Sequence, residues 1–287
     1  MCVVLASIAL VWWGMRTPGV TEDTRPSPAH VVVIVMENHE YASIIGSHAA
    51  PYINRLGSRF VLLTRYHAIR HPSLPNYLAL TGGSTFGIRT DCVRCRIRST
   101  NLVDQLDRND LSWKAYMEGM PHPCYRKPFH RRYAKKHDPF MYYDDIRTVD
   151  ARCKRVVPLS HLGSDLSNER LPRFAWISPN LCHDMHDCSV RAGDRWLRAW
   201  VPKILPALHP HGLLILTWDE GITRSACCAV AHGGRVVAIV AGPGARRGIR
   251  LGVPSDHYSV LGLIEDAFHL DRLRKAGQAP RVVGYRR

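Results

Sequence analysis

The sequence predicts an α/β protein built on a mostly parallel central sheet with helices above and below it. Two apolar runs carry this prediction, one at residues 31–36 and one at residues 213–218. Neither run alternates with polar residues, which is typical of strands that are buried on both faces. Because such strands occur in sheets covered by helices on both sides, the expected architecture is a three-layer α/β/α sandwich.

Oxygen-bearing side chains follow both of these strands. Glu37 and Asn38 come directly after the first run, and Asp219 and Glu220 come directly after the second. In open α/β sheets, ligands bind at the carboxyl ends of the strands. Carboxylates held side by side in a cleft repel each other unless a cation offsets them, so we expect a metal ion here. The alternative is that the two strands open into unrelated acidic loops.

The remaining elements are predicted from apolar spacing and turn residues. A broken helical pattern covers residues 41–57. Further helices are expected at 101–109, at 192–208 with an interruption at Pro202, and at 255–270. Further strands are expected at 60–63, 112–117, 174–177 and 236–240.

A helix that begins at Ser73 brings in a hydroxyl group. In the segment HPSLPNYLAL, Ser73 can serve as the N-cap, and Pro75 is tolerated in the first helical turn. The field at a helix N-terminus favours a bound phosphate and stabilises an alkoxide, so Ser73 is also a candidate nucleophile. An ordinary N-cap is the competing interpretation.

A dense cluster of ionisable side chains follows the strand predicted at 174–177. It lies between two cysteines and comprises His183, Asp184, His186 and Asp187. A disulfide between Cys182 and Cys188 would hold these side chains in place, as a preorganised site requires. The alternative is a polar surface loop with one disulfide.

Length and charge narrow the class of protein. With 287 residues, 46% of them hydrophobic, the chain can bury a full core as one α/β domain over residues 29–287. A net charge of +15 and a pI near 9.7 favour anionic partners such as phosphate esters or acidic lipids. The basic stretch 121–136 is either a substrate-facing insertion or a solvated loop. No nucleic-acid-binding signature accompanies it, so we expect no dedicated nucleic acid partner.

The N-terminus and the cysteines both predict a location outside the cytoplasm. Residues 1–28 comprise an apolar run, MCVVLASIALVWWGM, and a polar linker, which is typical of a signal peptide or a short signal anchor with membrane association. The run lacks a basic start, and a buried first strand is the alternative. Apart from Cys2, eight cysteines fit up to four disulfides. The Cys92-x-x-Cys95 pair also fits half of a zinc site or a redox motif.

Together these segments resemble the bacterial phosphoesterase family of secreted acid phosphatases and phospholipases C, within the alkaline-phosphatase-like superfamily. The similarity runs from about His30 to Leu270. It rests on the ordered set VVVIVMENHEY, HPSLPNYLALTGG, SPNLCHDMHDC, LLILTWDEG, VAIVAGPG and DHYSVLGLIEDAF. The resemblance implies an α/β/α sandwich and metal-dependent hydrolysis of phosphate esters.

The resemblance also implies roles for individual residues. It makes Ser73 the nucleophile and assigns the metal to Glu37, Asn38, Asp219 and Glu220. The wider superfamily usually has His where Glu220 stands, and often has Asp where Asn180 stands. Both departures favour one metal ion, or a hard cation such as calcium, magnesium, manganese or iron, over a two-zinc centre.

The expected reaction is in-line attack on phosphorus by a metal-activated Ser73 alkoxide, through a phosphoseryl intermediate that water hydrolyses. His186 or His183 is the candidate general acid for the leaving alkoxide. Asp184 is assigned to the metal site, and the assigned substrate contacts are His71, Asn76, Asn180, His232 and His257. Two alternatives stay open: a phospholipase C that acts on phospholipid diesters, and a non-catalytic secreted protein that binds anions.

Overall fold

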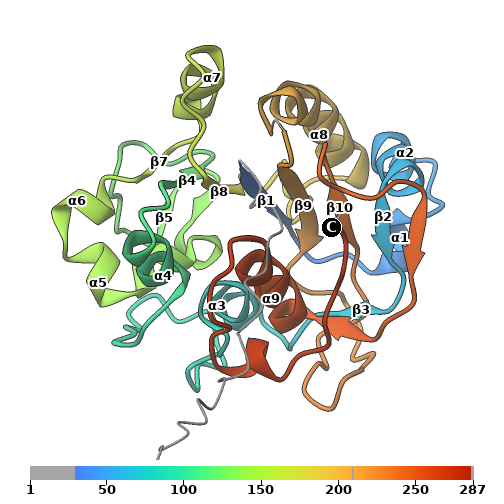
Figure 1. Ribbon diagram of the computed structural model, residues 1–287. Helices are drawn as coiled ribbons and strands as arrows, with labels where there is room; N and C mark the ends of the chain where they lie inside the picture. Colours follow the sequence, from blue (N-terminus) through green and yellow to red (C-terminus); the bar gives the residue numbers. More distant parts are fainter. Residues whose placement is uncertain (1–29, 209, 286–287) are drawn as a thin grey trace, which may run out of the picture.

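The computed structural model describes residues 30–208 and 210–285 and is organised around an eight-stranded sheet. The strand order is β11-β2-β10-β9-β1-β8-β4-β7 (Figure 1). β10 (Ala238–Ala241) runs antiparallel to both of its neighbours, and the other pairings in this sheet are parallel. The predicted mostly parallel sheet is therefore confirmed.

β1 (Val31–Met36) and β9 (Leu213–Trp218) form the centre of the sheet, and every residue of both strands is buried. They pair in parallel, with Val31 opposite Leu213 and Met36 opposite Trp218. Both strands therefore end at the same level. The residues that follow them emerge side by side at one edge of the sheet.

The other strands extend the sheet on both sides of this central pair. On the β1 side lie β8 (Phe174–Ser178), β4 (Trp113–Met117) and β7 (Val156–Pro158). Beyond β10 lie β2 (Val61–Leu63) and β11 (Ile249–Leu251). Two small sheets pair β3 (Tyr66–His67) with β12 (Ser255–Asp256), and β5 (Phe129–His130) with β6 (Tyr133–Ala134).

Helices cover both faces of the sheet. Figure 1 shows α2 (Pro51–Arg59) and α8 (Val190–Ile204) on one side of the row of strands, and α3 (Leu74–Gly82) and α9 (His257–Ala267) on the other. The shorter helices are α1 (Tyr41–Ile44), α4 (Leu102–Arg108), α5 (Asp144–Arg147), α6 (Asp150–Cys153) and α7 (Ser160–Ser167). The 3-10 turns are η1 (Lys135–His137), η2 (Pro139–Tyr142), η3 (Leu205–Leu208) and η4 (Arg274–Gly277).

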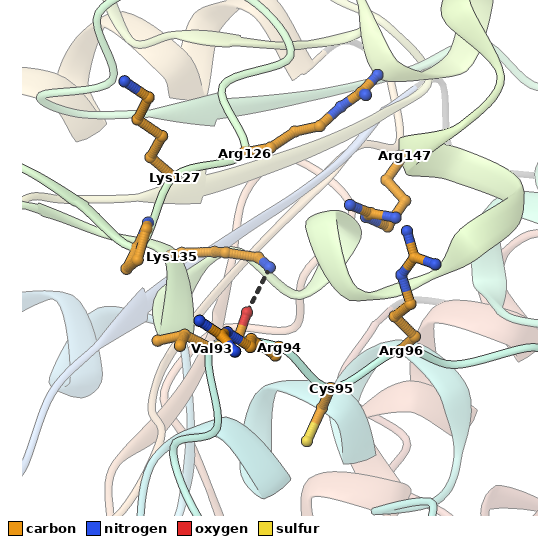
Figure 2. A pocket seen from close by; sticks show the side chains of 9 residues that line it. Val93, Arg94, Cys95, Arg96, Arg126, Lys127, Lys135 and Arg147 are labelled. Carbon is orange, nitrogen blue, oxygen red and sulfur yellow. Dashed lines mark hydrogen bonds between the residues drawn. The ribbon is translucent and has the colours of Figure 1, made fainter.

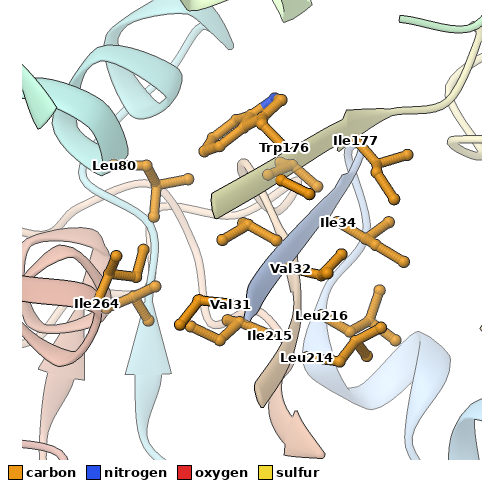
Figure 3. Close-up of a cluster of buried hydrophobic side chains, with 14 of the residues drawn as sticks. Val31, Val32, Ile34, Leu80, Trp176, Ile177, Leu214, Ile215, Leu216 and Ile264 are labelled. Carbon is orange, nitrogen blue, oxygen red and sulfur yellow. The ribbon is translucent and has the colours of Figure 1, made fainter. Parts of the chain in front are cut away.

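The core explains why the central strands are almost entirely apolar, with Thr217 of β9 as the exception. In Figure 3, Val31 of β1 and Ile215 of β9 lie toward Leu80 of α3 and Ile264 of α9. The alternate residues of the same strands, such as Val32 and Leu214, point to the opposite face. Since successive side chains of a strand alternate between faces, covering both faces favours apolar residues at nearly every position.

Two further predictions concern the helix at residues 192–208 and the signal segment at residues 1–28. The interruption predicted at Pro202 is wrong, because α8 continues through this residue to Ile204. Pro202 is exposed and lies in the last turn, so the missing N–H costs the helix little. The predicted signal segment at residues 1–28 lies outside the described residues, and in the part that is described no helix is long and apolar enough to cross a membrane.

The eight cysteines within residues 30–208 and 210–285 form four disulfides. The pairs are Cys92–Cys95, Cys124–Cys153, Cys182–Cys188 and Cys227–Cys228. The predicted closure of the 182–188 loop is confirmed. The Cys92-x-x-Cys95 motif is a disulfide rather than half of a zinc site.

A buried carboxyl in α9 is expected to make stability depend on pH. Glu265 accepts a hydrogen bond from the Leu273 N–H at 2.8 Å, and burial raises the pKa of this carboxyl to about 8. An unfolded glutamate titrates near pH 4.3, so between about pH 5 and 8 the folded state holds a proton that the unfolded chain releases. The free energy of unfolding therefore falls as the pH rises through this window.

Glu265→Gln should remove this dependence, because the amide keeps an acceptor for Leu273 and does not titrate. From pH 5 to pH 8, we expect wild type to lose about 1–2 kcal/mol of unfolding free energy relative to the variant. Urea denaturation at the two pH values measures the difference. Equal losses in both proteins would show that Glu265 does not hold the proton.

Candidate active site

Ser73 lies where two strand ends meet the start of α3. Its backbone occupies the N-cap position, but its side chain makes no capping hydrogen bond. The buried hydroxyl instead donates to Glu37 Oε2 at 3.1 Å and lies 3.3 Å from Glu220 Oε1. The interpretation of Ser73 as an ordinary N-cap is therefore wrong, because the hydroxyl faces carboxylates from two different strands.

Asp91 provides the capping interaction for α3. Its Oδ1 accepts a hydrogen bond from the Leu74 N–H at 2.9 Å, and its Oδ2 lies 3.1 Å from Lys136 Nζ. Burial disfavours the charge of Lys136, but the carboxylates of Glu37, Asp91 and Asp219 outweigh this and raise its pKa. Lys136 thus supplies a stable positive charge beside the acidic side chains.

Glu37 contacts side chains from two other elements. The Tyr77 hydroxyl donates to Glu37 Oε1 at 2.5 Å, and His137 Nε2 lies 3.2 Å from Glu37 Oε2. Tyr77 also stacks on His137, with ring centroids 5.4 Å apart. Tyr77 follows Ser73 by four residues on α3, so the two side chains share one face of the helix. This spacing is a signal in the sequence that points to Tyr77, which the sequence analysis left without a role.

The second acidic pair adjoins the first because of the strand register. Asp219 donates its backbone N–H to Met36 at 2.9 Å, and the Asn38 N–H donates to Asp219 Oδ1 at 3.2 Å. Asn38 adopts a left-handed φ of 47°, which asparagine tolerates better than most residues. The turn at the end of β1 thus folds back toward the end of β9.

This concentration of carboxyl groups strongly disfavours their ionisation. Burial raises the pKa of Glu37, and the charges of Asp219 and Asp184 raise it further. Burial and the charge of Glu220 likewise raise the pKa of Asp219. Burial and the charge of Asp91 raise the pKa of Glu220 to about 7. A cation at this position would reverse these shifts, because it favours the charged form of each group.

Oxygen atoms without a hydrogen-bond donor indicate which cation would fit. Residues 30–208 and 210–285 contain no group of three or more His, Cys, Asp or Glu side chains arranged to hold a metal ion. However, the buried oxygen atoms of the described residues that make no hydrogen bond include three at this site: Asn38 Oδ1, Asp184 Oδ2 and Asp219 Oδ2. An amide oxygen among carboxylates is a donor set for a hard cation, so the residues fit such an ion.

His137 connects Asp184 to the site. Its Nδ1 lies 3.3 Å from Asp184 Oδ2, while its Nε2 faces Glu37. Burial, together with the charges of Lys136 and His186, keeps the pKa of His137 well below its ordinary value, so the ring is neutral and has one N–H for two carboxyl groups. Burial raises the pKa of Asp184 to about 8.

His71 forms a proton-sharing pair with Glu220. His71 Nδ1 lies 2.6 Å from Glu220 Oε2, and His71 Nε2 lies 2.8 Å from the Thr223 carbonyl. Because a carbonyl can only accept, Nε2 carries a proton. Nδ1 therefore shares the other proton with Glu220, whose second oxygen faces Ser73.

The two histidines of the loop after β8 lie in different environments. His186 bonds Asp187 Oδ1 at 2.7 Å, and its ring lies 6.1 Å from that of His137, so it flanks the site. His183 pairs with Glu118 at 2.9 Å instead. Glu118 directly follows β4, so its position at a strand end is a signal that the sequence analysis missed. Asn180 accepts hydrogen bonds from the N–H groups of residues 182 and 183 and thereby shapes this loop.

Three predicted substrate contacts make other interactions. Asn76 Oδ1 accepts from the N–H groups of residues 69 and 70, and its Nδ2 donates to the carbonyls of residues 70 and 72, so it holds the loop that leads to Ser73. His257 is buried behind the site, with Nε2 2.5 Å from the Asp219 carbonyl and Nδ1 2.5 Å from the Tyr66 hydroxyl. His232 is exposed, and its backbone N–H donates to the Ile69 carbonyl.

The sequence of this chain is similar to those of known proteins. The model of the Phosphoesterase family matches residues 47–271. A Mycobacterium tuberculosis protein named phosphatidylinositol-3-phosphatase is 31% identical over 290 residues, which cover 97% of this chain and 90% of that protein. An acid phosphatase from Aspergillus fumigatus is 29% identical over 231 residues, which cover 76% of this chain. The match spans only 50% of the length of that fungal enzyme.

Solved structures with little sequence similarity share the fold. A protein of the alkaline phosphatase superfamily from Vibrio parahaemolyticus superimposes with a TM-score of 0.61 at 11% identity, covering 90% of this chain and 71% of that one. A lipoteichoic acid synthase from Listeria monocytogenes superimposes with a TM-score of 0.59 at 10% identity, covering 90% and 79%. The predicted alkaline-phosphatase-like sandwich is therefore confirmed.

Proposed function

This chain belongs to the phosphoesterase family and is a phosphoric ester hydrolase, and from this premise we propose that it cleaves phosphate monoesters with Ser73 as the nucleophile and a divalent metal ion beside it. One observation carries the proposal: the buried Ser73 hydroxyl contacts carboxylates from two strand ends, Glu37 and Glu220. Family membership also sets aside the non-catalytic alternative.

In the proposed reaction, Ser73 loses its proton as its Oγ forms a bond to phosphorus. Glu220 can accept this proton, because its Oε1 lies 3.3 Å from the Ser73 hydroxyl and its other oxygen is held by His71. The N-terminus of α3 stabilises the developing alkoxide. Lys136 lies beside the carboxylates and can bind an oxygen of the phosphate.

The bond from phosphorus to the ester oxygen breaks as the Ser73 bond forms, and the leaving alkoxide requires a proton. His186 is the proposed donor, because it is partly exposed at the flank of the site and is oriented by Asp187. Water then hydrolyses the phosphoseryl group, which returns Ser73 and releases inorganic phosphate.

The metal ion would be held by the oxygen atoms of Glu37, Asn38, Asp219 and Glu220. When bound, it supplies positive charge that stabilises the oxygens of the phosphoryl group in the transition state. Asp184 is better placed to orient His137 than to bind the same ion, since its side chain reaches the site through that imidazole. The unpartnered oxygens of Asn38 and Asp219 support this assignment.

A phosphate monoester is favoured over a phospholipid diester. The M. tuberculosis relative is named phosphatidylinositol-3-phosphatase, and two Aspergillus relatives are named acid phosphatase. Phospholipase C activity remains the second candidate. The four disulfides support a location outside the cytoplasm, where such bonds persist.

Chelation followed by metal addition tests both the cofactor and the substrate class. We expect dialysis against a chelator to lower turnover of an aryl phosphate by about 100-fold or more, and a hard divalent cation to restore it. A phosphatidylinositol monophosphate should be hydrolysed at its monoester, and a phosphatidyl diester much more slowly. Full turnover after chelation would remove the metal from the proposal, and faster turnover of the diester would make the protein a phospholipase C.

A further inference from the structure

A second, strongly basic cavity lies outside the carboxylate cluster. It has a volume of about 510 Å³ and is lined by residues 93–96, 126–128, 135 and 147 (Figure 2). Six of the lining side chains are cationic: Arg94, Arg96, Arg126, Lys127, Lys135 and Arg147. Within the described chain, no carboxylate lines the cavity.

Lys135 is the least expected of these side chains, because it is only 4% exposed. Its ammonium donates to the Val93 carbonyl at 3.0 Å and lies 4.4 Å from the centre of the Tyr142 ring. An ammonium has three N–H groups, yet among the described residues Val93 is its only hydrogen-bond acceptor, and no carboxylate lies within 4.0 Å. The carboxyl group of Asp138 acts on this ammonium electrostatically but forms no ion pair with it. Burying a cation without an ion pair is costly, so this arrangement favours an anionic ligand.

The other cations of the cavity are also incompletely neutralised. Asp144 lies 3.5 Å from both Arg96 and Arg147, and it additionally pairs with Arg98 at 3.1 Å. One carboxylate therefore serves three guanidinium groups. Arg94 and Lys127 have no ion pair in the part of the chain that the structure describes. Several arginines around a hollow form a donor set that suits phosphate.

Two short segments connect this cavity to the Ser73 site. Lys135 faces the cavity, and the next residue, Lys136, faces the acidic site, with Cα atoms about 3.8 Å apart. Asp91 contacts both Lys136 and the start of α3, and the loop closed by the Cys92–Cys95 disulfide then forms the cavity wall. The two sites are therefore built in part from adjoining residues of the chain.

We propose that this basic cavity binds a second phosphate group, carried by the same substrate molecule whose first phosphate lies at Ser73. The identity of the first site rests on the function proposed above. A hollow of this volume suits a phosphorylated polyol, because ligand pockets commonly measure about 300–1,000 Å³. A free phosphate ion has the same chemistry, and the two sources are separated below.

Calorimetric titration with inorganic phosphate tests the site without turnover. In a Ser73→Ala background with metal present, we expect Lys135→Met to lower the number of phosphate ions bound per chain by one. Methionine keeps a side chain of similar length. The double variant Arg94→Glu with Lys127→Glu changes only exposed residues at the rim of the cavity. It should also abolish this binding event, and it tests the proposal even if Lys135→Met fails to fold. The matched control, Arg195→Glu with Arg198→Glu on the exposed face of α8, should bind phosphate as the background does.

Unchanged phosphate stoichiometry in both cavity variants would overturn the proposal. If the Ser73 site does not bind phosphate, the background binds one ion and the variants none, so failure of the proposed function is distinguishable from failure of this inference.

Kinetics then identify the source of the second phosphate. For the Arg94→Glu, Lys127→Glu variant with Ser73 intact, we compare kcat/KM for an inositol bisphosphate with kcat/KM for an inositol monophosphate. We expect the ratio of the two to fall about tenfold, as for the loss of two partly exposed ion pairs. An unchanged ratio, with the calorimetric event lost, would assign the cavity to a free phosphate ion and overturn the bisphosphate assignment.

Discussion

Replacing Ser73 by alanine is expected to lower kcat for an aryl phosphate by about 10³-fold or more, the scale seen when a catalytic nucleophile is removed. The fold should persist, because Asp91 rather than Ser73 caps α3. Steady-state kinetics and thermal unfolding of the variant measure the two effects. In wild type quenched with acid during turnover, mass spectrometry should find phosphate on the peptide that contains Ser73.

Thr81→Val is the matched control for Ser73→Ala. It removes a buried hydroxyl from the same helix, one that donates to the Tyr77 carbonyl at 2.9 Å and contacts the Tyr143 hydroxyl at 2.9 Å. The variant should lose about 1 kcal/mol of stability and keep its turnover. If Ser73→Ala itself retains turnover, the nucleophile is water and the phosphoseryl intermediate is wrong.

Asp219→Asn is expected to have opposite effects on activity and on the stability of the metal-free protein. Asp219 Oδ1 accepts from the Asn38 N–H, an interaction that an amide oxygen preserves, while Oδ2 has no partner among the described residues. Losing this carboxylate should lower metal content and reduce turnover by about 100-fold. It should also raise the stability of the metal-free protein by about 1–2 kcal/mol, because one of several crowded acidic groups is gone.

Glu265→Gln is the control for Asp219→Asn, since it also replaces a buried carboxyl by an amide but lies at the far end of α9 from the strand ends. It should leave metal content and turnover unchanged. Metal analysis, turnover and urea denaturation after chelation compare the two variants. Normal metal content in Asp219→Asn would remove Asp219 from the ligand set, and a loss of metal-free stability would show that the residue is structural.

Strand ends were the best predicted part of the site. The apolar runs of β1 and β9 are visible in the sequence, and each is followed by its acidic pair. The rule that ligands bind at the carboxyl ends of strands also points to Glu118, which directly follows β4. Tyr77 could have been found in the same way, from its helical spacing relative to Ser73.

Other site residues carry no comparable signal. His137 and Lys136 come from η1, at the end of an irregular basic stretch that was interpreted either as a substrate-facing insertion or as a solvated loop. No periodicity places such a segment, because its position depends on long-range contacts. Ser178 at the end of β8, for example, donates to the His137 carbonyl at 2.7 Å. Asp91 is likewise placed by its contacts with Leu74 and Lys136.

The sequence by itself determined the sheet, its buried central strands and the residues that emerge at their ends. These features depend on local periodicity and on turn residues, which neighbouring positions of the chain specify. Only the tertiary structure decided that β1 and β9 are neighbours in a register that sets Glu37 beside Asp219, and that Lys136 and Lys135 face different sites. The physical reason is that pairing and packing depend on contacts between residues far apart in the chain, which no local pattern encodes.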